Sequence, residues 1–409
     1  MSETTQTAPL EPLPYLQALA NHLATEEREA WAWMSKDLSD PARADRMRLE
    51  LLKTTYRIER EARPALYELG EKVKQRLGLT NPMTFYQMQQ ADSGQMNAMQ
   101  FFIPGEVHTA FVGPVLDKLR DAELTALIGH EMGHFKLREE WNGRFRTTTE
   151  LLQALLHDDA THAVHGESYR LFCLYEEILC DRYAFLACDD LHASISMLVK
   201  AETGLSDVSA ESYLRQTDEI FSKGKLKTDG LSHPECYIRA WALKQWVDQP
   251  EDMEDRIREV IEGTPALDRL DLLGQRRTVR LTRYLIDALL WEHWFHSDAV
   301  LAHARLFFED FAPPKEEPSK EQIKALADID DPKLSQYFCF VLLDFASCDR
   351  ELEEPALAAA FLLCRKLGIQ DDFRTIACKE LKIRKKQFGK LEADAERILD
   401  GARKPGGKK

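Results

Sequence analysis

Apolar residues recur at helical spacing along almost the whole chain, and this periodicity changes clearly in one region. From about Tyr15 to Leu77 the spacing predicts helices. The segments "MTFYQMQQ" (83–90) and "NAMQFFIPG" (97–105) are short and rich in β-favouring residues, and "ADSG" between them predicts a turn between two strands. From there to about Ala312 the pattern is again mostly helical. The sequence therefore predicts a mainly α fold with a small β-sheet, an α+β class.

The segment "PPKEEPSKE" is the clearest predicted linker, because its prolines and charges neither continue a helix nor bury apolar area. The length of 409 residues also exceeds that of a usual single domain, and the apolar spacing beyond the linker suits a second helical core. The predicted division is a disordered tail over 1–12, a large unit over 13–312, a linker over 313–320, a helical domain over 321–400 and a basic disordered tail over 401–409.

Charge and cysteine usage narrow the functional classes. The chain has 54 Lys and Arg against 69 Asp and Glu, a net charge of −15, which argues against nucleic acid or an anionic membrane as a partner. No stretch reaches the roughly 18 continuous apolar residues that span a bilayer, and the first residues lack a signal-peptide pattern. The 8 cysteines include no CxxC pair, which is typical of reduced thiols. These features predict a soluble, cytoplasmic protein without membrane spans.

The stretch "ALIGHEMGHFK" places two histidines four residues apart on a predicted helix, for which Asp121 is the expected N-cap. Residues at i and i+4 share a helix face, so His130 and His134 can present two imidazole nitrogens to one metal ion. Glu131 lies beside this pair, where it can reach a metal-bound water. The alternative is an ordinary helix that carries these residues by chance.

A catalytic zinc site commonly has three protein ligands and one open position, so a third ligand is needed. The extended motif with a third histidine is excluded, because Leu137 and Glu140 occupy its positions. The remaining common arrangement is a glutamate on a second helix, with an aspartate one turn later that orients a ligand histidine. From Glu139 onwards, Glu177 with Asp181 is the first such pair. Alone, this pair is more typical of a solvated helix face, whereas with the two histidines it favours a metal site.

Four segments in this order are similar to a known family: "NAMQFFIPG", "ELTALIGHEMGHF", "EILCDRYA" and "LSHPECYIRAWAL". From about Ala65 to Leu243 the chain resembles the gluzincin family of CAAX prenyl endopeptidases and bacterial heat-shock protease X, with its soluble relatives. The resemblance implies a zincin-type metalloprotease domain in which His130, His134 and Glu177 hold Zn²⁺. It implies a zinc-dependent endopeptidase that hydrolyses peptide bonds of a protein or peptide through a metal-activated water.

The same resemblance implies roles for residues around the metal. Glu131 would be the general base, and Asp181 would orient a ligand histidine. In "HPECYIR", His233 would donate to the developing oxyanion and Arg239 would be a structural ion-pair partner. The alternative for this element is a simple loop before a helix.

Asn97 and Ala98 match the family's strand that binds an extended substrate by main-chain hydrogen bonds. The chain departs from the best-known members in having no membrane spans, which puts prenylated or membrane-embedded substrates in doubt. From another functional class, the alternative is a non-catalytic, zinc-stabilised scaffold that binds partners.

Two further features lie outside these motifs. His157, His162 and His165 suggest either a second metal site or, with their mixed spacing and polar neighbours, a solvated loop. The segment after the linker resembles the helical TerB-like fold, with Asp349 and Glu354 near the expected acidic positions. It lacks a glycine after the aspartate, so a helical module that binds a protein partner is favoured over acidic metal binding.

Overall fold

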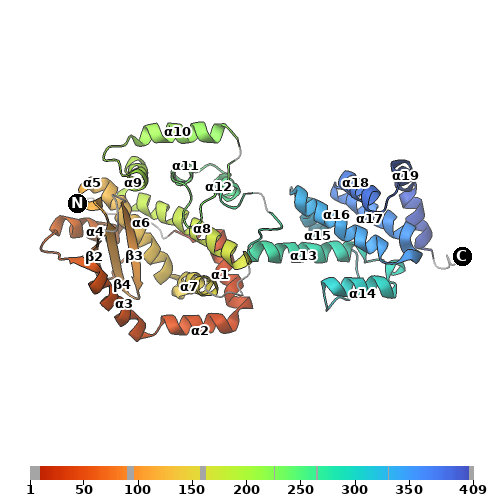
Figure 1. Ribbon diagram of the computed structural model, residues 1–409, viewed down its shortest axis with the longest axis horizontal. Helices are drawn as coiled ribbons and strands as arrows, with labels where there is room; N and C mark the ends of the chain where they lie inside the picture. The colour runs from red at the N-terminus through yellow and green to blue at the C-terminus, as the bar shows by residue number, and fades with distance from the viewer. Residues whose placement is uncertain are drawn as a thin grey trace. The chain divides into compact units, whose positions relative to one another are not determined.

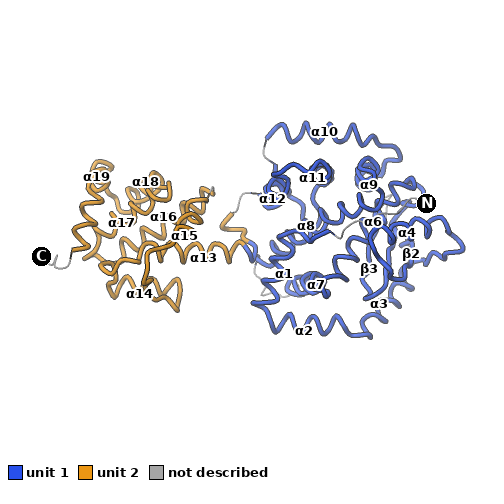
Figure 2. The backbone as a smooth tube through the Cα atoms, turned by 180° about the vertical axis from the view of Figure 1, so that it is seen from behind, with its two compact units in different colours: residues 1–263, 271–273 blue, residues 264–270, 274–409 orange. Residues whose placement is uncertain are grey.

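The computed structural model describes residues 10–89, 96–156, 163–224, 226–263, 266–329 and 331–404. The chain forms two compact units, which Figure 2 distinguishes by colour. Unit 1 comprises residues 1–263 and 271–273, and unit 2 comprises residues 264–270 and 274–409. Each unit encloses a hydrophobic core of its own.

Unit 1 consists of one small sheet and many helices, which confirms the predicted fold class. The strands are β1 (Thr55–Ile58), β2 (Met83–Met88), β3 (Asn97–Ile103) and β4 (Glu106–Val112). The helices are α1 (Pro14–Glu26), α2 (Arg28–Leu38), α3 (Pro41–Thr54), α4 (Pro64–Leu77), α5 (Val115–Lys118), α6 (Asp121–Glu139), α7 (Arg144–Leu156), α8 (Ala163–Cys188), α9 (Leu191–Thr203), α10 (Ala210–Ser222), α11 (Cys236–Asp248) and α12 (Met253–Glu262), with a 3₁₀ turn over Trp141–Gly143.

The sheet has the strand order β1-β2-β4-β3, in which β2 and β4 are parallel and the other neighbours are antiparallel. The two predicted strands are present as β2 and β3, but they are not neighbours, because β4 lies between them. Their predicted turn, at 91–94, lies outside the described residues. β1 falls in a stretch predicted to be helical; its Thr, Tyr and Ile favour extended backbone once β2 is available for pairing. This order leaves β3 at an edge of the sheet.

Helices α6 and α8 form the centre of unit 1, and Figure 1 shows α6 between the sheet and α8. Their close contact depends on two glycines of α6. A Cβ on Gly129 would overlap the side chain of Ala187, and one on Gly133 would lie only 3.0 Å from the side chain of Tyr183. Larger residues at these positions would push the helices apart. The glycines that flank His130 therefore let α8 approach the histidine face of α6.

The start of α6 differs in detail from the prediction. Arg120, not Asp121, is the N-cap residue, and Asp121 is the first residue of the helix. Glu123 lies in the first turn, where its carboxylate accepts the backbone N–H of Arg120 at 2.8 Å and the buried ammonium of Lys200 at 2.7 Å. This buried pair fixes the start of α6 against α9.

Unit 2 is helical throughout its described residues. Its elements are most of α13 (Leu272–Leu289), a 3₁₀ turn over His293–Phe295, α14 (Asp298–Phe307), α15 (Lys320–Ala327), α16 (Pro332–Ser347), a 3₁₀ turn over Arg350–Leu352, α17 (Glu353–Leu367), α18 (Gln370–Glu380) and α19 (Lys385–Ala402).

The division between the units lies at residues 263–274, not at the predicted linker. Leu285 of α13 and Val300 of α14 belong to the same buried cluster as Phe338 and Phe361. Residues 313–320 therefore connect α14 to α15 inside unit 2. A proline-rich, charged segment is compatible with any exposed connection, and the apolar faces of α13 and α14 decide to which core they belong.

None of the described helices combines the length and the apolar character that a membrane span needs.

Candidate metal centre

A cleft of about 670 Å³ opens over the histidine face of α6. Residues of α6 from Leu127 to Arg138 line it, with the first residues of β3 on one side and residues of α8, α9 and α11 around the rest. Four elements distant in sequence therefore meet α6 at the place where the motif residues lie.

His130, His134 and Glu177 come together in this cleft. The Nε2 atoms of the two histidines are 3.3 Å apart, as expected for one turn of α6. Glu177, on α8, lies with its carboxylate oxygens 3.5 Å from Nε2 of His130 and 3.3 Å from Nε2 of His134. Each residue offers one potential ligand atom, and these three atoms lie within 4.8 Å of one another. Among the described residues, this is the group of His, Cys, Asp and Glu side chains that is arranged to hold a metal ion.

The donor set suits a divalent metal ion. Two imidazole nitrogens and one carboxylate are a common protein ligand set for Zn²⁺, and they leave a coordination position open. Glu177 Oε2 is buried and lies 3.1 Å from the guanidinium of Arg239, but it accepts no aligned hydrogen bond from any described residue, so it keeps lone pairs for a further cation. The residues of the cleft therefore fit a metal ion of this type.

Behind the cleft, each ligand histidine contacts a second carboxylate. Nδ1 of His130 is 3.1 Å from Asp181, which lies one turn after Glu177 on α8. Arg239 of α11 binds Asp181 with two hydrogen bonds of 2.6 and 2.8 Å and also lies 3.1 Å from Glu177. The contact between Asp181 and Nδ1 fixes the imidazole ring of His130 and leaves its Nε2 directed into the cleft.

His134 has an equivalent arrangement that the sequence analysis did not predict. Its Nδ1 is 3.2 Å from Glu176, although not aligned for a hydrogen bond, and Glu176 is 3.2 Å from the guanidinium of Arg138. The pattern of a glutamate followed by an aspartate one turn later does not include Glu176, because Cys180 stands at the later position. The available signal was the spacing of Arg138, one helical turn after His134, together with a second glutamate beside Glu177.

Charge pairing keeps these buried carboxylates ionised. Burial opposes ionisation of Glu176, but Arg138 and His134 lower its pKa to about 2. Against the effect of burial, Arg239 and then His130 hold the pKa of Glu177 well below its usual range, and Arg239 lowers the pKa of Asp181. The site thus presents negative charge to the histidine ring nitrogens at neutral pH.

Glu131 differs from these three carboxylates because its side chain is unpaired. It is buried, with 4% of the residue exposed, and lines the cleft next to the two histidines. Its carboxylate forms no hydrogen bond or ion pair with any part of the chain that the structure describes. Its carboxylate is therefore available to contact a molecule in the cleft.

His233 and the start of β3 border the same cleft. His233 is 56% exposed, with Nε2 at 3.5 Å from Glu177 and Nδ1 at 2.8 Å from the hydroxyl of Ser232. Asn97 is exposed at the start of the edge strand β3, and Ala98 beside it is buried. The N–H of Ala98 donates to Oδ1 of Asn97 at 2.9 Å. The side chain of Asn97 therefore accepts the hydrogen bond that the backbone N–H of Ala98 would otherwise offer to a molecule beside the cleft.

His157, His162 and His165 were the candidates for a second metal site. His157 and His162 lie outside the described residues, and His165, in the first turn of α8, does not line the cleft.

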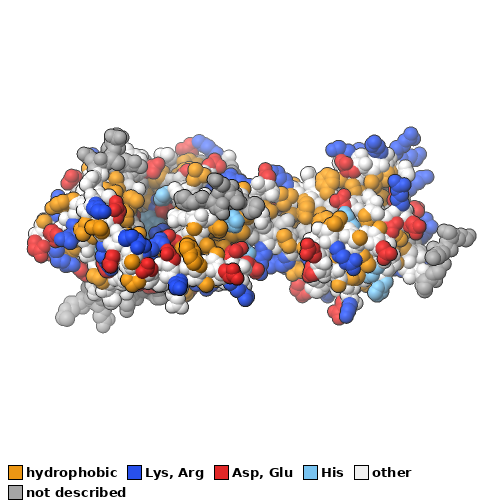
Figure 3. All heavy atoms as spheres, turned by 60° about the horizontal axis from the view of Figure 1, so that its bottom comes forward, with side chains coloured by type: hydrophobic (Ala, Val, Ile, Leu, Met, Phe, Trp, Pro, Cys, Tyr) orange, Lys and Arg blue, Asp and Glu red, His pale blue; other side chains and the backbone are white. Residues whose placement is uncertain are grey.

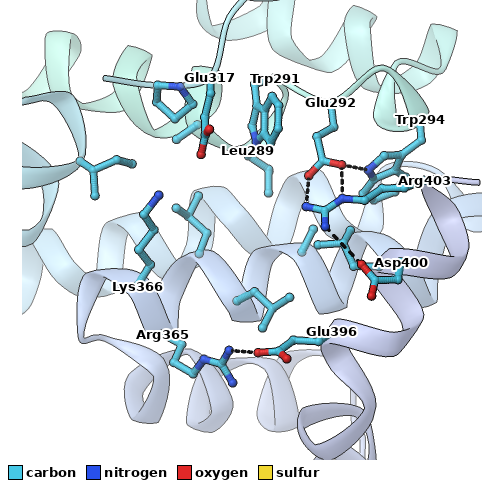
Figure 4. Close-up of a pocket in the computed structure, with 17 residues that line it drawn as sticks. Leu289, Trp291, Glu292, Trp294, Glu317, Arg365, Lys366, Glu396, Asp400 and Arg403 are labelled. Atoms are coloured by element: carbon cyan, nitrogen blue, oxygen red, sulfur yellow. Dashed lines mark hydrogen bonds and ion pairs between the residues drawn. The ribbon is translucent and has the colours of Figure 1, made fainter. Parts of the chain in front are cut away.

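Unit 2 contains a separate pocket of about 620 Å³, shown in Figure 4. Glu292 holds the guanidinium of Arg403 at 2.6 and 2.7 Å and accepts the indole N–H of Trp294, and Arg365 pairs with Glu396. The lining contains neither histidine nor cysteine. Of these two cavities, the cleft of unit 1 is the one that contains a group of side chains arranged to hold a metal ion.

Comparison with known protein families agrees with a metal centre in unit 1. Residues 61–173 match the sequence model of peptidase family M48. The M48 match contains His130, Glu131 and His134 and ends before Glu177, which α8 brings next to the two histidines. It supports a metallopeptidase in unit 1 and does not extend to unit 2. No curated protein and no solved structure matches the chain significantly.

The two carboxylates behind the histidines, Asp181 and Glu176, lead to a prediction for this site. We expect Asp181→Asn and Glu176→Gln each to weaken zinc binding by roughly 10–100-fold, because each removes a charge that orients one ligand histidine. The measurement is a competition titration against a chelating dye. Asp218→Asn, an exposed carboxylate paired with Lys244, is the matched control and should bind zinc like the wild type. Wild-type affinity in Glu176→Gln would mean that His134 needs no such support.

Proposed function

We propose that the protein is a zinc-dependent endopeptidase of the gluzincin type, acting on extended protein or peptide segments. The observation that carries this proposal is the unpaired, buried Glu131 beside the His130, His134 and Glu177 group in an open cleft. A purely structural zinc site is usually closed by four protein ligands, whereas this group offers three and adds a free carboxylate. The M48 match supports the same reaction class.

Residues of the chain supply the other parts of the reaction. His130, His134 and Glu177 would hold the zinc ion, which when bound supplies Lewis acidity at the scissile carbonyl. Glu131 takes a proton from the water that attacks the carbonyl carbon and then gives it to the leaving amine as the C–N bond breaks. His233, exposed at the mouth of the cleft, donates a hydrogen bond to the oxyanion that forms. Protons balance, because Glu131 ends the cycle in the state in which it began.

The edge strand β3 supports an extended substrate. A peptide added along this edge would form main-chain hydrogen bonds with β3, as strands do in sheets. In the free protein Asn97 occupies the N–H of Ala98, so its side chain would turn away when a substrate carbonyl takes that donor. Met197 and Leu198 of α9 line the cleft and offer apolar contacts to substrate side chains.

The rival function is a zinc-stabilised scaffold without catalysis. Such a scaffold would have its cleft filled by the N-terminal helices or by the segment between the two ligand helices. The described residues leave about 670 Å³ open around the histidines and Glu131, which supports the enzyme over the scaffold.

The decisive experiment is incubation of the purified protein with denatured casein, with and without a zinc chelator. We expect casein cleavage that stops with the chelator and returns when Zn²⁺ is added back, because the ligand residues need the ion to complete the site. Cleavage that persists in the chelator would indicate a contaminating or metal-independent protease. A zinc-loaded protein that leaves casein and other unfolded substrates intact would favour the scaffold.

A further inference from the structure

The connection between α18 and α19 carries a concentration of positive charge. Exposed basic side chains occur at five of the nine positions from 382 to 390, and we call this segment the basic turn. Its basic residues are Lys382, Arg384, Lys385, Lys386 and Lys390. Figure 3 shows Lys and Arg side chains gathered on the side of unit 2 where Figure 1 places α18 and α19. The feature stands out in a chain whose net charge is −15.

None of these five side chains forms an ion pair or hydrogen bond with the described residues of the chain, whereas several basic residues elsewhere in unit 2, such as Arg283, Arg374 and Arg403, do. Lys386 and Lys390 are one helical turn apart, where like charges repel. The first turn of α19 contains Lys385 and Lys386 and no acidic residue, which is unfavourable at the positive end of a helix dipole. The folded chain therefore retains a local repulsion that no ion pair with a described acidic residue offsets.

The backbone beneath these charges is firmly held. Phe388 is 1% exposed and packs its ring against Phe361 and Phe373, with centroids 6.0 and 6.4 Å apart. Leu381 and Ile383 also pack against the core of unit 2. The apolar side chains of the segment thus point inward while the basic ones face solvent, so the charges are displayed on a fixed support.

This arrangement distinguishes between classes of anionic partner. No large hydrophobic side chain is exposed in the basic turn, so it offers neither an apolar group for insertion into a bilayer nor an aromatic ring for stacking with bases. Outside the turn, unit 2 has 20 Lys and Arg against 24 Asp and Glu, so a long polyanion that extended beyond the turn would meet a surface without net positive charge. A short acidic peptide segment would feel mainly the turn itself, because charges are screened over about 8 Å at physiological salt.

We propose that the basic turn of unit 2 is a docking surface for a short Asp/Glu-rich segment of a partner protein. Carboxylates of that segment would replace the missing acidic partners of the five basic side chains and relieve their repulsion. The surface belongs to unit 2 and uses no residue of the metal cleft, so the proposal is independent of the proteolytic activity.

The test measures fluorescence anisotropy of a labelled ten-residue peptide in which glutamates alternate with serines, titrated with the full-length protein. The matched peptide with glutamine at each glutamate position gives the neutral reference. We expect the acidic peptide to bind, and the triple variant Lys382→Glu, Arg384→Glu and Lys386→Glu to weaken its binding by about tenfold or more. This variant should stay folded, because Glu at position 386 suits the first turn of a helix, and circular dichroism checks that it does.

The control variant has the same change in net charge elsewhere on unit 2, at Lys315→Glu, Lys320→Glu and Lys324→Glu. It should bind the acidic peptide within about twofold of the wild type, since long-range charge is screened. Equal losses in both triple variants would overturn the proposal, as would an acidic peptide that binds no better than its neutral counterpart. Two further probes are phosphatidylserine vesicles and a single-stranded oligouridylate. Tighter binding of either one than of the peptide, lost in the basic-turn variant, would assign the surface to a different partner class and also overturn the proposal.

Discussion

Glu131→Gln should lower the rate of casein cleavage by about 10²–10⁴-fold while leaving the zinc content unchanged, because the substitution removes the proton acceptor and retains the ligands. Glu131 forms no hydrogen bond or ion pair with the described residues, so the isosteric change should not disturb the fold. The measurements are cleavage rate, zinc per chain by elemental analysis and the thermal unfolding midpoint.

Glu139→Gln provides the control for this result. Glu139 lies on the same helix, outside the cleft, so its variant should cleave casein at close to the wild-type rate. Cleavage at the wild-type rate by Glu131→Gln would show that another group accepts the proton. Loss of zinc in that variant would instead show that Glu131 is a ligand, and the roles given to Glu131 and Glu177 would then need to be exchanged.

The second large effect is expected on metal content. Protein purified without a histidine tag should contain close to one zinc per chain, and the double variant His130→Ala and His134→Ala should contain close to none, because two of three ligands are lost. Glu177→Gln should bind zinc more weakly than the wild type and keep more zinc than the double variant. Elemental analysis after dialysis measures all three proteins.

An exposed histidine outside the cleft serves as the reference for these variants. His192→Ala should retain the wild-type zinc content, because His192 does not line the site. Unchanged zinc in the double variant would remove the basis of the proposed function. Identical metal content in Glu177→Gln and Glu131→Gln would contradict the division of roles between these two carboxylates.

Much of the candidate site could be predicted because it depends on local helical geometry. His130 and His134 share a face of α6 wherever that helix packs, and Glu177 and Asp181 share a face of α8 for the same reason. Each of these two pairs can therefore be recognised in the sequence from its spacing alone. That the two pairs face each other was a hypothesis, taken from a requirement for a third ligand and from a family resemblance.

The sheet was less predictable, because its strands are short and their pairing is non-local. β2 and β3 could be recognised from their β-favouring residues, but β1 is only four residues long and follows a helix directly. The parallel pairing of β2 with β4 places a strand between two that appeared to form a hairpin. Backbone pairing carries little sequence information of its own, so strand order depends on which buried faces meet.

By itself, the sequence determined the fold class and the helix face that carries His130 and His134. These are properties of composition and of short periods along one element. The tertiary structure alone decided that α13 and α14 belong to unit 2, that β3 is an edge strand and that Arg138 and Glu176 support His134. These outcomes depend on the close packing of elements distant in sequence, such as α6 and α8 at Gly129 and Gly133, which no local pattern specifies.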